Sequence, residues 1–145
     1  MEKVTEVFAC KCFETGIDAS QITFGHCAEK LGLDEKTALK ISSAFGGGMW
    51  NGETCGCVVG ALMALGYKYG NDAPDQKETK KALLAKKTEF EEKFKKENGS
   101  LVCREILGYD ISKPEGMDKI KEKGLFFTIC PKAVVTACKI LDEIL

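Results

Sequence analysis

Proline, histidine and long apolar runs are all scarce in this 145-residue chain. It has three prolines, and no linker-like or low-complexity segment divides it, so we expect a single domain over residues 1–145. A single histidine, His26, excludes a histidine-rich metal site. Glycine or a charged residue interrupts every apolar stretch well before the roughly 18 residues that a transmembrane helix needs, so no membrane insertion is expected.

Net charge is equally scarce, because 21 basic residues nearly cancel 22 acidic ones. Without a net field the chain has no general attraction for nucleic acid or for an anionic membrane, and no nucleic-acid partner is expected. The first 20 residues carry acids early and lack a continuous apolar stretch, so they do not resemble a secretory signal. The expected protein is soluble and cytoplasmic.

Strand signals are almost absent, whereas helix signals are frequent. β-branched residues are scattered, and no segment alternates apolar and polar side chains over six residues. The sequence therefore predicts an all-α fold, a compact bundle of about six to seven helices. Its centre is predicted to be an apolar helix whose Gly56 and Gly60 form a G-x-x-x-G face, a pattern that favours close helix packing over ligand binding.

Capping residues and glycines set the predicted helix boundaries. Asp18 and Gln21 predict a capping box at the start of a helix that ends before Gly32. The further predicted N-caps are Asp34, Thr54, Ser100 and Thr128. Residues 46–48 are predicted to form a loop and residues 118–122 a turn. The predicted helices span about residues 3–13, 19–31, 35–45, 55–65, 77–97, 101–107 and 129–145. The predicted buried faces hold Leu83, Leu84, Phe90 and Phe94 in one helix and Val134, Cys138, Leu141 and Leu145 in the last.

Eight cysteines are the unusual feature of the chain. Cytosolic thiols are normally kept reduced, so structural disulfides are disfavoured, and metal binding, redox cycling or core packing are the alternatives. Cys55, Cys103 and Cys130 each follow a predicted N-cap closely enough to lie in a first helical turn. Free N–H groups and the helix dipole there are expected to lower the thiol pKa from roughly 8.5 and to favour the thiolate, the form that attacks, oxidises and binds metals.

The remaining five cysteines divide between core packing and chemistry. Cys138 lies on an apolar helix stripe and is predicted to pack in the core. Cys10 and Cys12 sit within one helix and diverge by roughly 200°, so at most one of them joins a site. Cys27 lies in mid-helix and is expected to pack in the core rather than to take part in chemistry. For Cys57 the two alternatives, core packing and a chemical role, stay equally open.

Four segments carry a family resemblance. They are, in order, FETGIDASQ, FGGGMWNGETCGCVVGALMALGYKYG, NGSLVCREILGYD and FFTICPKAV. With this order and spacing the chain resembles the bacterial C_GCAxxG_C_C family of redox proteins over nearly its whole length. The resemblance implies a small helical protein with four characteristic cysteines and, through a similar domain of split-Soret cytochromes, an iron–sulfur centre.

Three family cysteines match Cys55, Cys103 and Cys130. The fourth family position is Ala19 here, and Cys57 or Cys27 is the hypothesised replacement for the missing ligand. The expected cofactor is a [2Fe–2S] cluster or zinc held by these thiolates, with no metal an equal alternative because of Ala19.

The leading functional hypothesis is a redox-active protein whose clustered thiolates bind an iron–sulfur cluster or another metal and exchange electrons with an unidentified redox partner. Cys55, Cys103 and Cys130 are the expected redox thiols, and Cys57 joins them in holding the cofactor. Two alternatives stay open. One is thiol–disulfide exchange without metal, in which a low-pKa thiol attacks and a neighbour resolves. The other is a non-catalytic, homodimeric helical module with vestigial cysteines.

Overall fold

Helices account for nearly all of the regular structure, which confirms the all-α prediction. The computed structural model describes residues 1–145 and contains no strand beyond one isolated bridge. The α-helices are α1 (Glu6–Glu14), α2 (Ala19–Leu31), α3 (Glu35–Ile41), α4 (Gly56–Tyr69), α5 (Lys77–Asn98), α6 (Cys103–Leu107), α7 (Pro114–Glu122) and α8 (Ile129–Ile144), with a π-type turn η1 (Gly48–Gly52) and a 3₁₀ turn η2 (Leu125–Phe127).

Capping chemistry fixes the starts of α2 and α3 where the sequence predicts them. The Asp18 N–H donates to Gln21 Oε1 at 2.9 Å, which forms one arm of the capping box. Asp34 Oδ2 accepts from the Thr37 N–H at 2.9 Å at the start of α3. α2 ends at Gly32 in the left-handed conformation, with φ of 71°.

α3 ends at Ile41, short of the predicted end at Phe45. The buried Ser42 explains the difference. Its hydroxyl donates back to the Ala38 carbonyl at 2.7 Å, and its own carbonyl accepts from Ser20 Oγ at 2.8 Å. Because the Ser42 carbonyl is bonded to α2, it does not accept the next helical N–H, and the chain turns toward η1.

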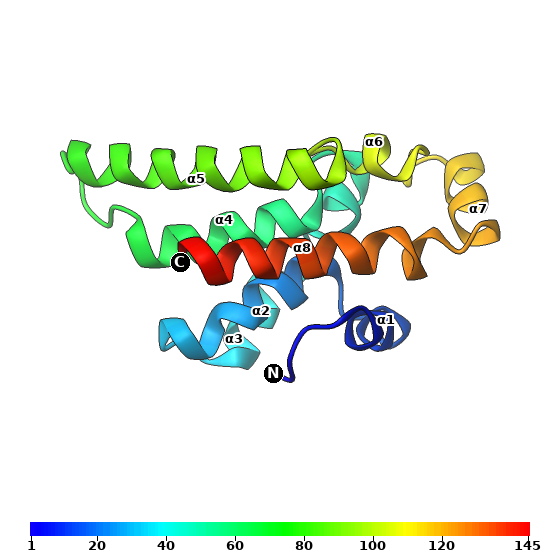
Figure 1. Ribbon diagram of the computed structural model, residues 1–145, viewed down its shortest axis with the longest axis horizontal. Helices are drawn as coiled ribbons and strands as arrows, with labels where there is room; N and C mark the ends of the chain where they lie inside the picture. Colours follow the sequence, from blue (N-terminus) through cyan, green and yellow to red (C-terminus); the bar gives the residue numbers. More distant parts are fainter.

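Three long helices, α4, α5 and α8, run side by side along the molecule, with α2, α3 and α1 beneath them (Figure 1). Where α4 meets α2, a Cβ on Gly60 would lie 2.5 Å from the Ser20 carbonyl oxygen. A Cβ on Gly56, one turn earlier, would lie 3.1 Å from the Ser20 nitrogen. The G-x-x-x-G face is therefore a helix-packing surface, as predicted.

The main core lies between α2, α4, α5 and α8. Phe90 and Phe94 of α5 are fully buried there, with their ring centroids 5.8 Å apart. The predicted α8 stripe is buried along its whole length, at Val134, Cys138, Leu141 and Leu145. Leu84, predicted on the inner face of α5, is instead 47% exposed. It lies about 100° around the helix from Leu83, which shares the face of Phe90 seven residues on.

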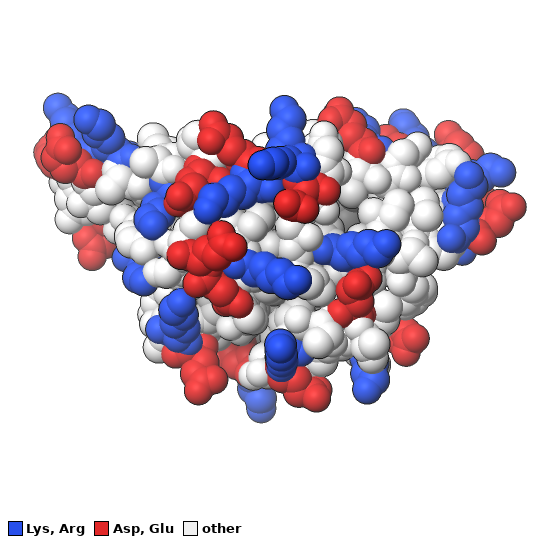
Figure 2. All heavy atoms as spheres, in the orientation of Figure 1, with Lys and Arg blue, Asp and Glu red and all other residues white.

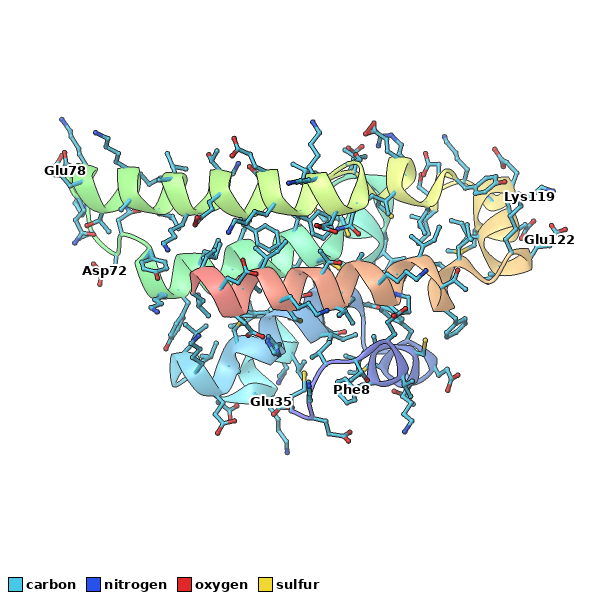
Figure 3. All side chains as sticks on the ribbon, in the orientation of Figure 1. Phe8, Glu35, Asp72, Glu78, Lys119 and Glu122 are labelled. Atoms are coloured by element: carbon cyan, nitrogen blue, oxygen red, sulfur yellow. The ribbon has the colours of Figure 1, made fainter.

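A second, smaller core joins α6 to α7, formed by Cys103, Leu107, Ile111 and Ile120. α7 is a complete nine-residue helix where the sequence predicted only a turn. Pro114 occupies its first position, where the fixed φ of proline suits a helix start. Ile120 is fully buried, while Lys119 and Glu122 project outward at the end of the molecule (Figure 3).

Charged side chains of both signs are interspersed over the face shown in Figure 2, without a patch of one sign. No single helix is long and apolar enough to cross a membrane. α7 and the segment Leu125–Ile144 reach that length and composition only together, as a pair bent by 57°, and the apolar side of α8 is buried in the core.

Candidate redox site

A short backbone bridge brings two distant cysteines together. Thr54 pairs with Val102 in the isolated antiparallel bridge. On either side of it, the Cys55 N–H donates to the Leu101 carbonyl at 2.8 Å, and the Cys103 N–H donates to the Glu53 carbonyl at 2.6 Å. Successive residues of an extended segment alternate in direction, so Cys55 and Cys103 leave the bridge on the same face.

The bridge also explains why two predicted N-caps are wrong. Thr54 lies in the bridge, and Cys55 itself is the N-cap of α4. Ser100 precedes the bridge, where its hydroxyl accepts from the Val102 N–H at 3.0 Å and donates to Glu105 at 2.6 Å, and α6 starts after Val102. Thr128 is the N-cap of α8, as predicted.

Four of the eight cysteines line one pocket of about 360 Å³: Cys55, Cys57, Cys103 and Cys130. Each lies at a helix start, as the N-cap of α4, the second residue of α4, the first of α6 and the second of α8, respectively. Ala19, the first residue of α2, also lines it. The pocket thus lies where the N-terminal ends of α2, α4, α6 and α8 meet.

Cys55 differs chemically from its neighbours. The Cys57 thiol and the backbone N–H groups of Cys57 and Val58 lower the pKa of Cys55 despite its partial burial. The Cys55 sulfur and burial together hold the pKa of Cys57 well above its ordinary value. Of the two thiols, Cys55 is therefore the one that loses its proton first.

Burial governs the other two pocket thiols. It raises the pKa of Cys103 to about 12, with the nearby Cys55 sulfur as the next cause. It also raises the pKa of Cys130, again followed by the Cys55 sulfur. The predicted first-turn placement is confirmed for Cys103 and Cys130, whereas Cys55 is the N-cap, one residue before the first turn of α4. The predicted lowering of pKa is confirmed only for Cys55, because removal of the other two thiols from water outweighs the helix N-terminus.

The other four cysteines lie outside the pocket. Cys27 is 2% exposed and lies in the main core near Cys138, whose predicted core packing is confirmed. Cys27 therefore does not line the pocket with the family cysteines, whereas Cys57 does. Cys12 is buried, and the Cys10 thiol faces the Phe127 carbonyl at 3.5 Å.

One wall of the pocket is a strained backbone segment. The sequence predicted a plain loop at the glycine run, but four consecutive residues, 47–50, are left-handed. Met49 has φ of 59° and Trp50 has φ of 58°, a conformation that costs non-glycine residues about 1–2 kcal/mol each. Gly48 is required at its position, because a Cβ would lie 2.4 Å from the Glu53 nitrogen.

The lining of the pocket is mainly apolar. Besides Trp50 of the strained segment, it includes Phe13, Ile106, Ile111, Phe126 and Phe127. Asp18 and Lys121 are its only charged residues, and burial raises the pKa of Asp18. Sequence reasoning missed this aromatic wall. The available signal was the single tryptophan two residues after the glycine run, since strained backbone concentrates at functional sites.

The sulfur set suits some metals better than others. No three His, Cys, Asp or Glu side chains are arranged to hold a single metal ion. Tetrahedral zinc with Zn–S bonds of about 2.3 Å would need sulfurs roughly 3.8 Å apart, so the pocket does not match a closed zinc site. Four sulfur donors in an apolar pocket are the type of ligand that a [2Fe–2S] cluster takes.

A family model described as "Putative redox-active protein (C_GCAxxG_C_C)" matches residues 17–144. The chain belongs to this C_GCAxxG_C_C family. No curated protein and no solved structure matches it significantly. Ala19, where the sequence resemblance expects the fourth family cysteine, lines the same pocket as Cys55, Cys57, Cys103 and Cys130. Besides the three cysteines that the resemblance names, the pocket is lined by one more, Cys57.

Proposed function

We propose that this redox-active family member works through its pocket thiols by thiol–disulfide exchange, with Cys55 as the attacking residue and Cys57 as the resolving one. The observation that carries the proposal is the gathering of four thiols in one apolar pocket, each at a helix start. Within that set, Cys55 and Cys57 are two residues apart, and each shifts the pKa of the other.

The exchange needs a disulfide compound as the oxidant. The Cys55 thiolate attacks one sulfur of that compound, a mixed disulfide forms, and the other half leaves as a thiolate. Cys57 then gives up its proton to the medium and attacks the Cys55 sulfur, which releases the second half as a thiol or thiolate. Two protein thiols are oxidised to one disulfide, and one external disulfide is reduced to two thiols.

A second candidate is supported by the donor set itself. Cys55, Cys57, Cys103 and Cys130 would hold a [2Fe–2S] cluster, with Cys57 in place of the family cysteine at Ala19. The bound cluster would supply one-electron transfer. The chain's own contribution would be an apolar pocket that excludes water, together with helix N-termini that stabilise negative charge.

One preparation tests both candidates. The protein is purified without oxygen, its iron and visible spectrum are measured, and it is then titrated with a disulfide while mass tagging locates the remaining thiols. Cys55→Ser, Cys57→Ser and Cys103→Ser are the test variants. Cys10→Ser is the matched control, because Cys10 is partly exposed and outside the pocket.

A colourless, iron-free protein that forms a Cys55–Cys57 disulfide supports the exchange reaction. Two irons per chain, lost on Cys103→Ser but retained in Cys10→Ser, support the cluster and overturn the exchange proposal. An Ala19→Cys change combined with Cys57→Ala should then restore cluster binding. An iron-free protein in which Cys55 oxidises no faster than Cys10 overturns both candidates.

A further inference from the structure

We propose that the pocket binds a small, uncharged molecule with a planar apolar ring against Trp50. Resting on the proposed exchange reaction, we infer further that this molecule carries the disulfide that Cys55 attacks. The two statements name the substrate class of the redox pocket, and they follow from its size, its walls and the depth of its thiols.

The depth of the thiols argues for a small molecule. Cys57 is 1% exposed and Cys103 is 6% exposed, while Cys55 and Cys130 are only partly exposed. A small disulfide enters a pocket with thiols at this depth more readily than a disulfide held on the surface of a folded protein. A cavity of about 360 Å³ falls within the roughly 300–1,000 Å³ of small-molecule sites.

The aromatic walls argue for a planar apolar body. Trp50 and Phe127 line the pocket, yet they are 47% and 46% exposed. Each therefore presents part of its ring to the pocket and part to water. A planar ring stacked on Trp50 would remove this apolar surface from water and gain the offset contact that aromatic pairs favour.

The orientation of Trp50 is fixed in advance. The left-handed turn at 47–50 leaves little freedom, because Gly48 is packed against Glu53 and Cys103. A Cβ on Gly47 would lie 3.0 Å from the Trp50 ring, so the ring also lies directly on the backbone of the turn. A ring held in place before binding loses little conformational entropy when a ligand stacks on it.

The sparse charges argue for an uncharged ligand. Apart from the Cys55 thiolate, Asp18 and Lys121 are the only charged groups that line the pocket, and their charges are of opposite sign. A charged ligand would lose its hydration in an otherwise apolar pocket and would meet one like charge as well as one opposite charge. An uncharged ligand avoids both costs.

The test separates binding from chemistry. Binding is measured with N-phenyl-1-naphthylamine, an uncharged planar fluorophore without a disulfide, added to the reduced full-length protein. Chemistry is measured as the oxidation rate of the thiols by uncharged 4,4′-dithiodipyridine and by the doubly negative Ellman disulfide, each rate divided by that for free cysteine. The variants are Trp50→Ala and Phe127→Ala, with Tyr67→Ala as the control, because Tyr67 is 54% exposed and outside the pocket.

We expect saturable binding of the fluorophore, weakened about tenfold by Trp50→Ala and more weakly by Phe127→Ala, with Tyr67→Ala unchanged. We also expect the uncharged disulfide to react at least about tenfold faster than the charged one, a preference that Trp50→Ala reduces. Circular dichroism checks that each variant folds. Trp50-dependent binding with inert thiols would overturn the exchange reaction and leave the ligand site standing. Rapid Cys55 oxidation with no binding and no preference between disulfides would overturn the ligand site alone.

Discussion

Two glycines of α4 offer a matched test of the packing that positions the pocket. Gly60 faces α2, where a Cβ would lie 2.5 Å from the Ser20 carbonyl oxygen and 3.2 Å from the Ser20 Cα. Gly66 lies in the same helix, and a Cβ added there would have nothing within 4 Å. Changing each to alanine adds the same methyl group to the same helix, so the comparison isolates the contact with α2.

The expected magnitudes follow from two opposing effects. Alanine favours a helix interior over glycine by about 1 kcal/mol, so Gly66→Ala should raise the free energy of unfolding by up to about that amount. At Gly60 the same gain is opposed by overpacking against backbone atoms, which typically costs about 1–3 kcal/mol and lies near the upper end here because a carbonyl cannot rotate away. Gly60→Ala should therefore be about 2–3 kcal/mol less stable than Gly66→Ala.

The assay is urea unfolding followed by circular dichroism, with a reducing agent present to keep the eight cysteines as thiols. For a domain of this length the difference corresponds to roughly 6–12 °C in Tm. Because α2 and α4 both begin at the pocket, Gly60→Ala should also change the alkylation rate of Cys55. Equal stability of the two variants would refute the close α2–α4 approach.

Two further predictions concern single residues of the pocket wall and its rim. Met49→Gly should stabilise the fold by up to about 1 kcal/mol, because glycine adopts the left-handed conformation without strain. A loss of stability in urea unfolding would show that the contacts of the Met49 side chain outweigh the strain of its backbone. Asp18→Asn should raise Tm at pH 7, because burial raises the folded-state pKa of Asp18 and the charged form therefore opposes folding. That gain should fade as the pH falls through the raised folded-state pKa toward the ordinary Asp value of about 3.9, and a gain that persists at pH 3 would contradict it.

Local signals were predictable from the sequence, because they depend on neighbouring residues. The capping box at Asp18, the glycine stop at Gly32 and the buried stripe of α8 are all present. The first-turn placement of Cys103 and Cys130 followed from similar local reasoning, and it survived even though Ser100 proved not to be the cap.

Features that depend on contacts between distant segments were not predictable. Nothing in the sequence indicates that Thr54 pairs with Val102, or that this bridge sets the start of α4. The burial of Cys130 could not be predicted from the sequence either, and this burial is what raises its pKa. The left-handed turn that carries Trp50 is also held by tertiary contacts, since Gly48 abuts Cys103.

The two cores differ greatly in size, with 23 buried residues in the main one and four in the α6–α7 cluster. Cys57 belongs to the main core and Cys103 to the α6–α7 cluster, so the candidate site lies at the boundary between the two cores. Segments with fewer buried contacts open at lower free energy, so amide hydrogens of α7 should exchange with deuterium well before those of α4. A covalent link between Cys55 and Cys103 would join the two cooperative units, and the exchange rates of α7 would then approach those of the helices around it.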